Sequence, residues 1–367
     1  MNKRIQAIDL ARGASTSMLV VIHTLWMYGD QHTQASTLLG SIVHLMGKGT
    51  GMFLITMGFS FTFSRNQSLK LSFRRGFILL AVGYGMNFLK FIVPTVAGVM
   101  PDNFIKAYGW TPPATFENML YMLSTGDILQ LAGLSLFLMG VVNHFSKNKY
   151  VPLVLAIIVA AIAPFVRGVR VGVQGVDYVL DLLWGVHYNV YFTLFPWVAF
   201  ILAGIFFGRL YQDVGRDIGL TFKRMWQYGL VFLVVGGALC LYDFKYHFAD
   251  FFHLGFGGTL YLIGFSLLLT WFAHWLSTVV KPNKVFDFFL YLSPRVTSFY
   301  IIQWVMVCWG MCIVGFQRFN ASEVLITMPI MMAICLGVQW LWDRVKGRFG
   351  KGKPKAPKKQ EKELVTA

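Results

Sequence analysis

Long apolar runs recur along the whole chain, and no other feature constrains the fold as strongly. They lie near residues 13–29, 36–63, 76–100, 127–145, 150–167, 190–211, 226–246, 256–280, 294–316 and 322–343. A helix needs about 20 apolar residues to cross the hydrocarbon core of a bilayer. The chain is also 56% hydrophobic and only 13% charged, which is outside the range of soluble domains. We therefore predict an all-α polytopic membrane bundle of about ten transmembrane helices, formed by residues 1–343.

Basic residues alternate between two sets of connections along the chain. One set carries most of them: Lys3, Arg4 and Arg12; Arg65, Lys70, Arg74 and Arg75; Lys147 and Lys149; Arg209, Arg216, Lys223 and Arg224; Lys281 and Lys284; and residues 344–367. The other set, near 30–35, 101–126, 168–189, 247–255 and 317–321, has only Lys106, Arg170 and Arg318. Because cytoplasmic connections carry the excess of Lys and Arg, both termini are predicted to be cytoplasmic. Residues 344–367 read as a basic, disordered tail.

The formal net charge of +16 raises the question of nucleic-acid binding. The basic residues cluster at the ends of apolar runs, however, where orientation and anionic lipid headgroups explain them better. The four cysteines lie inside apolar runs, so no disulfide framework is indicated. Cys308 and Cys312 share a helix face, but no His or acid accompanies them at ligand spacing, so packing is favoured and no metal is expected.

The first apolar run carries a histidine far from its charged start. If residues 9–29 are helical, eleven steps of 100° bring His23 within about 20° of Arg12 and about 16 Å deeper. Half of a hydrocarbon core measures about 15 Å, so Arg12 marks the rim and His23 lies near the midplane. An ionisable side chain at that depth usually faces a cavity or a pathway, and we predict a functional role for His23.

The second apolar run carries His44 and Lys48, one helical turn apart and at a depth similar to that of His23. Glycines flank the lysine at positions 47, 49 and 51. Gly47 and Gly51 form a small-xxx-small pattern that is typical of close helix packing. Alternatively, the glycines loosen the helix so that backbone groups line a polar cavity, and a buried lysine favours this second interpretation.

Two of the less basic connections are long and rich in aromatic residues. Their notable side chains are Tyr108, Trp110, Trp184 and His187, with Asp177 and Asp181 among them. They are expected to form either a lid over a polar, saccharide-like acceptor or an aromatic belt at the membrane interface. Asp127 opens the apolar run that follows the first of these connections. It either orients an acceptor or a catalytic histidine, or stabilises a helix N-terminus.

The segment IDLARG, whose Arg12 is separated from His23 by ten residues, resembles the first helix of the transmembrane acyltransferase superfamily. GMFLITMGFSFTFSR and RRGFILLAVGYG resemble its second and third spans, and DILQLAGLSLFLMG, FPWVAFILAGIFFGRL and LSPRVTSFYIIQWVMV resemble later blocks. The likeness is greatest to bacterial relatives of heparan-alpha-glucosaminide N-acetyltransferase and to acyltransferase family 3. Two departures stand out: Gln303 replaces a histidine, and a paired-arginine spacing is reduced to Arg74-Arg75.

This resemblance implies an acyltransferase of the bacterial plasma membrane. Such an enzyme moves an acyl group, here expected to be acetyl, from cytoplasmic acyl-CoA to a hydroxyl or amine of an extracytoplasmic saccharide. His23 would act as general base, Lys48 or backbone N–H groups beside the glycines would stabilise the oxyanion, and His44 and Asp127 would assist. The CoA phosphates would be bound by basic residues at the rim: Arg12, Arg65, Lys70, Arg74 and Arg75.

Two other functions remain open from the residues alone. A secondary transporter or exporter would use the same intramembrane His and Lys side chains as a substrate or proton pathway. A noncatalytic membrane subunit would use them for packing alone, and His23, His44 and Lys48 would then face lipid or separate pockets.

Overall fold

The computed structural model describes residues 5–64, 67–187 and 189–349, and its regular structure is helical throughout these ranges. The elements in chain order are α1 (Gln6–Tyr28), α2 (Gln31–Ser36), α3 (Leu38–Gly47), α4 (Thr50–Phe61), α5 (Leu69–Asn87), the π-helix η1 (Phe88–Ile92), α6 (Val93–Val96), α7 (Asp102–Ala107), α8 (Phe116–Leu123), α9 (Ile128–Phe145), α10 (Tyr150–Val166), α11 (Gln174–Trp184), α12 (Leu194–Asp213), α13 (Ile218–Tyr242), α14 (Phe244–Phe248), α15 (Phe256–Val279), α16 (Lys284–Leu292), the 3₁₀-helix η2 (Ser293–Arg295), α17 (Val296–Val314) and α18 (Ala321–Phe349).

The predicted all-α membrane bundle is confirmed. In the described ranges, eight helical segments are long and apolar enough to cross a membrane. They cover eight of the ten predicted runs. Of the other two, α10 has only 17 residues, and α1 is not among the eight segments. The count of ten, the cytoplasmic termini and the boundary at residue 343 therefore stay predictions, and the tail from residue 350 lies outside the described residues.

Helix α12 lies at the centre of the bundle because it is apolar on every side. In the most apolar 18-residue stretch of α12, 89% of the residues are buried inside the bundle. In the corresponding stretch of α13 only 22% are buried, and its apolar side chains face outward, as expected for lipid contact. Two glycines let the α4 and α12 backbones touch: a Cβ at Gly58 would lie 1.9 Å from the Ile201 carbonyl oxygen, and one at Gly204 would lie 2.1 Å from that of Ile55. Small residues at such crossings permit close packing.

The second predicted run is broken at Lys48 and Gly49, between α3 and α4. Each explanation of its glycines applies at a different position. A Cβ at Gly51 would lie 2.4 Å from Ser266 Oγ, so this glycine permits helix packing. A Cβ at Gly47 would meet no atom within 4 Å, because Gly47 borders a cavity. The break therefore places the Lys48 side chain at the edge of that space.

Helix α5 continues into the π-helical turn η1, which carries Lys90. A π-helical turn inserts an extra residue into the helical repeat, and such turns occur frequently at functional sites. Lys90 is only 1% exposed, although it carries a cationic group. A buried lysine requires compensation by charge or hydrogen bonds, so its surroundings are informative.

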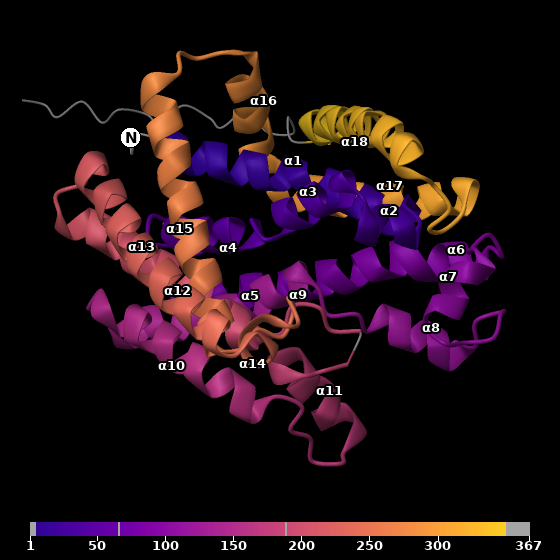
Figure 1. Ribbon diagram of the computed structural model, residues 1–367, viewed down its shortest axis with the longest axis horizontal. Helices are drawn as coiled ribbons and strands as arrows, with labels where there is room; N and C mark the ends of the chain where they lie inside the picture. Colours follow the sequence, from indigo (N-terminus) through magenta and orange to yellow (C-terminus); the bar gives the residue numbers. More distant parts are fainter. Residues whose placement is uncertain (1–4, 65–66, 188, 350–367) are drawn as a thin grey trace, which may run out of the picture.

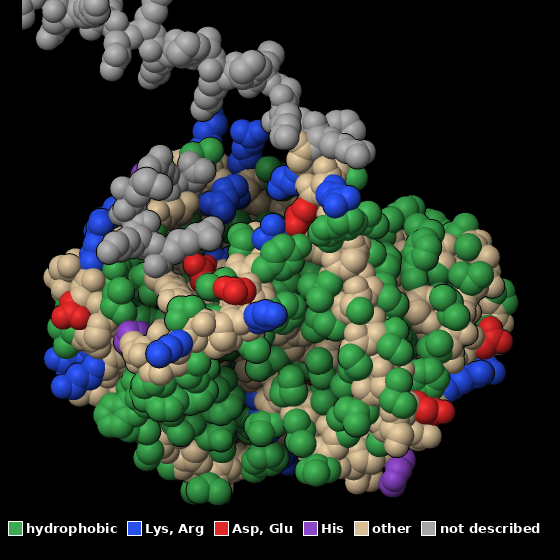
Figure 2. All heavy atoms as spheres, turned by 90° about the horizontal axis from the view of Figure 1, so that it is seen from above, with side chains coloured by type: hydrophobic (Ala, Val, Ile, Leu, Met, Phe, Trp, Pro, Cys, Tyr) green, Lys and Arg blue, Asp and Glu red, His purple; other side chains and the backbone are tan. Residues whose placement is uncertain are grey.

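The bundle has two ends that differ in construction. Helix α1 runs from the N-terminus toward α2, and the short helices α6, α7 and α8 lie at the far end of the molecule from the N-terminus (Figure 1). We call the end where α1 and α5 begin the N-terminal end, and the end that carries α2, α7, α8 and α11 the loop end. Figure 2 shows broad hydrophobic areas on one face, with most Lys and Arg side chains gathered toward one edge.

Candidate functional site

Two cavities lie toward opposite ends of the bundle and adjoin inside it. The loop-end cavity has a volume of about 400 Å³ and is bordered by residues of the loop-end connections. The N-terminal cavity has a volume of about 220 Å³. Leu19, Ile128 and Tyr300 line both of them. Together the cavities span much of the bundle, with one shared wall between them.

The loop-end cavity brings together all four candidate catalytic residues. His23, His44, Lys48 and Asp127 line it, although they come from α1, α3, the α3–α4 turn and the start of α9. All four border one common space: His23 and Asp127 are buried, Lys48 is half-buried and His44 is exposed at its edge. This is the arrangement that an active site or a substrate pathway requires, and packing alone does not call for it.

Gln303 of α17 fixes the tautomer of His23. Its amide Nε2 donates to the Tyr300 carbonyl oxygen at 3.1 Å, which directs its Oε1 toward His23 Nδ1 at 2.8 Å. An amide oxygen only accepts hydrogen bonds, so Nδ1 carries the proton. In the neutral ring, Nε2 therefore holds a lone pair. His23 is thus oriented as a base, as in sites where a second group holds the imidazole.

Aromatic rings surround His23. Trp304 stacks on the imidazole with centroids 3.7 Å apart and an interplanar angle of 21°, and Trp26 lies 5.5 Å away. The same Trp304 ring contacts the Lys90 ammonium, whose Nζ is 4.3 Å from the ring centroid. The histidine and the buried lysine are therefore neighbours through one indole ring.

Lys90 and Asp127 form a buried ion pair beside this ring. Nζ lies 3.7 Å from Asp127 Oδ2, and the two side chains are 2% and 4% exposed. The Tyr300 hydroxyl lies beside the same carboxyl and accepts a hydrogen bond from Trp304 Nε1 at 2.9 Å. Asp127 also caps α9, because its Oδ1 accepts from the Ile128 N–H at 2.8 Å. Asp127 therefore stabilises the N-terminus of α9, as one interpretation predicted, whereas a role in orienting an acceptor or a catalytic histidine stays a prediction.

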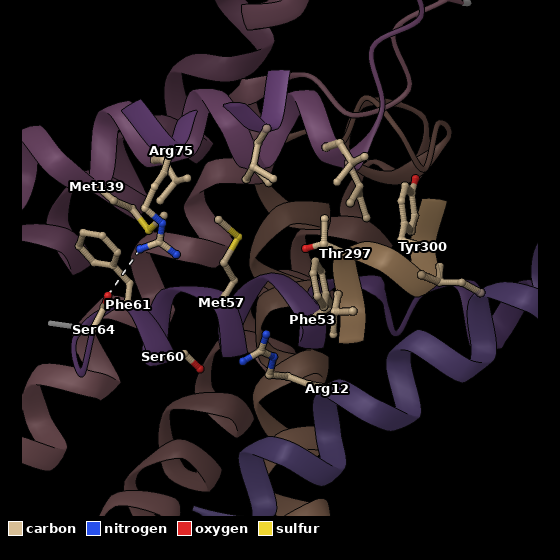
Figure 3. A pocket seen from close by; sticks show the side chains of 17 residues that line it. Arg12, Phe53, Met57, Ser60, Phe61, Ser64, Arg75, Met139, Thr297 and Tyr300 are labelled. Carbon is tan, nitrogen blue, oxygen red and sulfur yellow. Dashed lines mark hydrogen bonds between the residues drawn. The ribbon is translucent and has the colours of Figure 1, made fainter. Parts of the chain in front are cut away.

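Two guanidinium groups, one from α1 and one from α5, line the N-terminal cavity. Arg12 and Arg75 line it together with Met57 and Met139, and Arg75 Nη1 donates to Ser64 Oγ at 3.5 Å. Tyr300 lies at the side of the cavity away from Arg75 (Figure 3).

Two of the other three rim residues do not share this position, and the third lies outside the described residues. Lys70 and Arg74 are exposed on α5 and do not line the N-terminal cavity, and Arg65 lies outside the described residues. Arg74 and Arg75 are adjacent on one helix, so their side chains point about 100° apart and only one of them faces the cavity.

Of the predicted acceptor residues, Tyr108 alone reaches the loop-end cavity. Trp110 stacks behind it, with ring centroids 4.7 Å apart, and supports it from outside. Trp184 donates to the Val169 carbonyl oxygen at 3.1 Å, and His187 does not line the cavity. The first aromatic connection therefore contributes a side chain to the cavity and the second contributes none of the predicted ones, and the choice between a lid and an aromatic belt stays a prediction.

Acidic residues in the second connection hold the loop itself. Asp177 accepts hydrogen bonds from the backbone N–H groups of Val171 and Gly172, and Asp181 pairs with Arg170. These carboxylates are engaged locally and do not line the cavity.

The connection that precedes α15 supplies another wall of the loop-end cavity through Phe251 and Phe252. His253 Nδ1 lies 2.6 Å from Asp250 Oδ2, and this hydrogen bond lowers the pKa of the Asp250 carboxyl below its usual value. Arg167 Nη2 donates to the Leu254 carbonyl oxygen and attaches the connection to the end of α10. These hydrogen bonds fix the loop that carries the two phenylalanines.

Three site residues were not singled out from the sequence: Lys90, Tyr300 and Trp304. Lys90 could have been found, because it lies within the apolar run 76–100 and the argument used for His23 applies to it. Tyr300 and Trp304 lie in the apolar run 294–316 and carry no charge, so their sequence pattern gives no signal. Gln303 was noted only as a departure from the family pattern, and its contact with His23 was not foreseen. Within the described ranges, no three His, Cys, Asp or Glu side chains lie close enough to hold a metal ion.

About two thirds of the chain matches a known protein family. Residues 4–244 match the family described as "Heparan-alpha-glucosaminide N-acetyltransferase, catalytic". The chain belongs to this family. Membership supports a membrane acetyltransferase-type function, in agreement with the resemblance in the first helix. No curated protein matches the chain. The family match contains His23, Lys90 and Asp127 but ends before α17, which supplies Tyr300, Gln303 and Trp304.

Proposed function

We propose that this protein transfers an acetyl group from acetyl-CoA, bound at the N-terminal end, to a hydroxyl or amine of an acceptor in the loop-end cavity. The observation that supports this most is the pair of adjoining cavities, one with guanidinium groups and one with an oriented histidine. In the predicted orientation the donor binds from the cytoplasm and a saccharide acceptor enters from outside. A bacterial plasma membrane is the proposed location.

The charge and shape of the N-terminal cavity suit CoA as the donor. CoA carries several phosphate charges at one end and a narrow thioester arm at the other. Arginine suits phosphate because its guanidinium group offers paired donors in a fixed geometry. Arg12 and Arg75 would bind the phosphates, and the arm would extend along Met57 and Met139 toward Tyr300. The thioester would then lie at the wall shared with the loop-end cavity.

The chemical step uses the unprotonated Nε2 of His23. It takes the proton of the acceptor hydroxyl or amine while that oxygen or nitrogen bonds to the thioester carbonyl carbon. The carbon–sulfur bond then breaks, and the imidazolium returns the proton to the CoA sulfur. Lys90 would supply positive charge to the developing oxyanion. We favour Lys90 over Lys48 for this role because Lys90 contacts the ring that stacks on His23.

Donor binding can be tested at the N-terminal cavity. The change Arg75→Ala is expected to raise KM for acetyl-CoA about tenfold with little change in kcat, because a charge-assisted phosphate contact is lost. Arg12→Ala is expected to act in the same direction. Steady-state kinetics of purified protein in lipid nanodiscs measures both constants. Arg224→Ala removes an exposed guanidinium from α13 and serves as the matched control. Unchanged donor KM in both cavity variants would contradict this donor site.

Gln303 provides a second test that separates orientation from folding. In Gln303→Leu, Nδ1 loses its acceptor, so the tautomers mix and we expect kcat to fall about tenfold. In Gln303→Glu the acceptor is kept and the carboxylate stabilises the protonated ring, so activity should recover but only at higher pH. The acidic limb of the pH–rate profile measures this shift. Identical profiles for wild type and Gln303→Glu would show that Gln303 does not act through His23.

The adjoining cavities are also compatible with a transporter, which needs a route between the two ends. Family membership favours the transferase. Proteoliposomes separate the two functions: a transporter moves labelled acceptor without any acyl donor, whereas the proposed enzyme releases free CoA thiol only when donor and acceptor are both present.

A further inference from the structure

The Lys48 ammonium has no partner charge within the loop-end cavity. Its side chain is half-buried at the break between α3 and α4, and its Nζ lies 5.3 Å from the centroid of the Phe248 ring. No hydrogen bond or ion pair joins it to another residue in the described part of the chain. A cation in a membrane cavity is costly unless a ligand or a charge compensates it.

The charges that line this cavity do not balance. Among its described lining residues, Asp127 is the single carboxylate, and it is already paired with Lys90. Lys48 therefore adds an uncompensated positive charge, and His44 supplies a further hydrogen-bonding group one turn earlier on α3. An anion placed beside Lys48 would restore neutrality within the low dielectric of the bundle.

Two amide side chains of the cavity offer acceptor atoms. Gln34 Nε2 donates to the Gly29 carbonyl oxygen at 2.7 Å, and Gln317 Nε2 donates to that of Trp26 at 3.2 Å. Both side chains line the cavity, and with their amide nitrogens engaged, their Oε1 atoms remain to accept hydrogen bonds. Hydroxyl groups of a ligand are suitable donors to them. The open space beside Gly47 gives a ligand access to Lys48.

We propose that Lys48 is an anion-binding subsite for the acceptor, which carries a carboxylate, sulfate or phosphate group together with hydroxyl groups that donate to Gln34 and Gln317. This assigns the acceptor to the acidic polyols, whether free acidic sugars or phospholipid headgroups such as phosphoglycerol. The inference rests on the proposed function, in which the loop-end cavity is the acceptor side. It gives Lys48 a role in acceptor selection, distinct from that of the buried Lys90.

The first experiment measures binding without turnover. Full-length protein in phosphatidylcholine nanodiscs is titrated with glucuronic acid, glucose 6-phosphate and glucose, and tryptophan fluorescence reports occupancy because Trp26 and Trp304 line the cavity. We expect the two acidic sugars to bind about ten- to hundredfold more tightly than glucose, as for hydrogen bonds to a charged group. Lys48→Gln should abolish the preference, Lys48→Arg should keep most of it, and Lys106→Gln, at an exposed position of α7, should leave it unchanged.

The second experiment measures acetyl transfer and separates the sources of the anion. Acidic sugars are offered in phosphatidylcholine nanodiscs, and phosphatidylglycerol nanodiscs are tested with no sugar added. Acetylated sugar in the first arm assigns a soluble acceptor, and acetylated lipid in the second assigns a headgroup.

The two experiments fail in distinguishable ways. Equal binding of acidic and neutral sugars, or a preference that survives Lys48→Gln, overturns the anion subsite whatever the turnover shows. Preferential binding of acidic sugars that depends on Lys48, without acetyl transfer in either arm, supports the subsite and overturns the proposed enzymatic function.

Discussion

Replacement of His23 by alanine is expected to reduce acetyl transfer by about 10²- to 10⁴-fold, the usual contribution of a positioned general base. The reason is specific to the geometry: Gln303 Oε1 at 2.8 Å holds the proton on Nδ1 and leaves Nε2 as the base. Release of CoA thiol in nanodiscs measures the rate. Binding of acetyl-CoA should persist, because the N-terminal cavity does not include His23.

The control for this variant is His32→Ala, which removes an exposed histidine from α2 outside both cavities. It should retain wild-type turnover. His23→Gln preserves a polar side chain of similar size and should be as inactive as the alanine variant, because an amide does not accept the proton. Normal turnover in either His23 variant would remove the basis of the proposed mechanism.

Separate replacement of Lys90 and Asp127 is expected to destabilise the protein by about 3–5 kcal/mol each, because either change leaves a buried charge without its partner. The double variant Lys90→Met with Asp127→Asn removes both charges and keeps a side chain able to cap α9. We expect it to recover most of the thermal stability and none of the acetyl transfer. Thermal unfolding in detergent and thiol release measure the two quantities.

This double variant separates a structural pair from a catalytic one. The control is the pair of Lys149 and Asp213, which lie 2.8 Å apart but are 22% and 51% exposed. Its disruption should cost no more than about 1 kcal/mol, since exposed pairs are weakened by solvent. A stable double variant of Lys90 and Asp127 with normal turnover would show that the buried pair serves folding alone.

Local sequence patterns were sufficient to predict where His23 lies. Helical periodicity and residue rise depend only on the chain between Arg12 and His23, and the apolar run specifies the helix. The same argument applies to Lys90, which is a basic residue within an apolar run. Its pairing with Asp127 could not be inferred, because the two residues belong to different helices and a π-helical turn alters the direction of the lysine.

The residues predicted to bind the acceptor could not be placed from the sequence. Four aromatic or histidine side chains in two long connections were grouped by composition, and only Tyr108 lines the loop-end cavity. Loop conformation depends on contacts such as those of Asp177 with the backbone and of Trp184 with Val169, which no periodic pattern encodes. At the rim, Arg75 lines the N-terminal cavity and Arg74 does not, because neighbouring residues on α5 face different directions.

The sequence by itself determined that this chain is a helical membrane protein with a histidine deep in its first helix, because hydropathy and helical repeat are local properties of the chain. Only the tertiary structure decided which nitrogen of His23 carries the proton, since its partner Gln303 is 280 positions away on α17. It also decided that two cavities adjoin at Leu19, Ile128 and Tyr300. These features depend on how separate helices pack, and helix packing is set by the shapes of many side chains together.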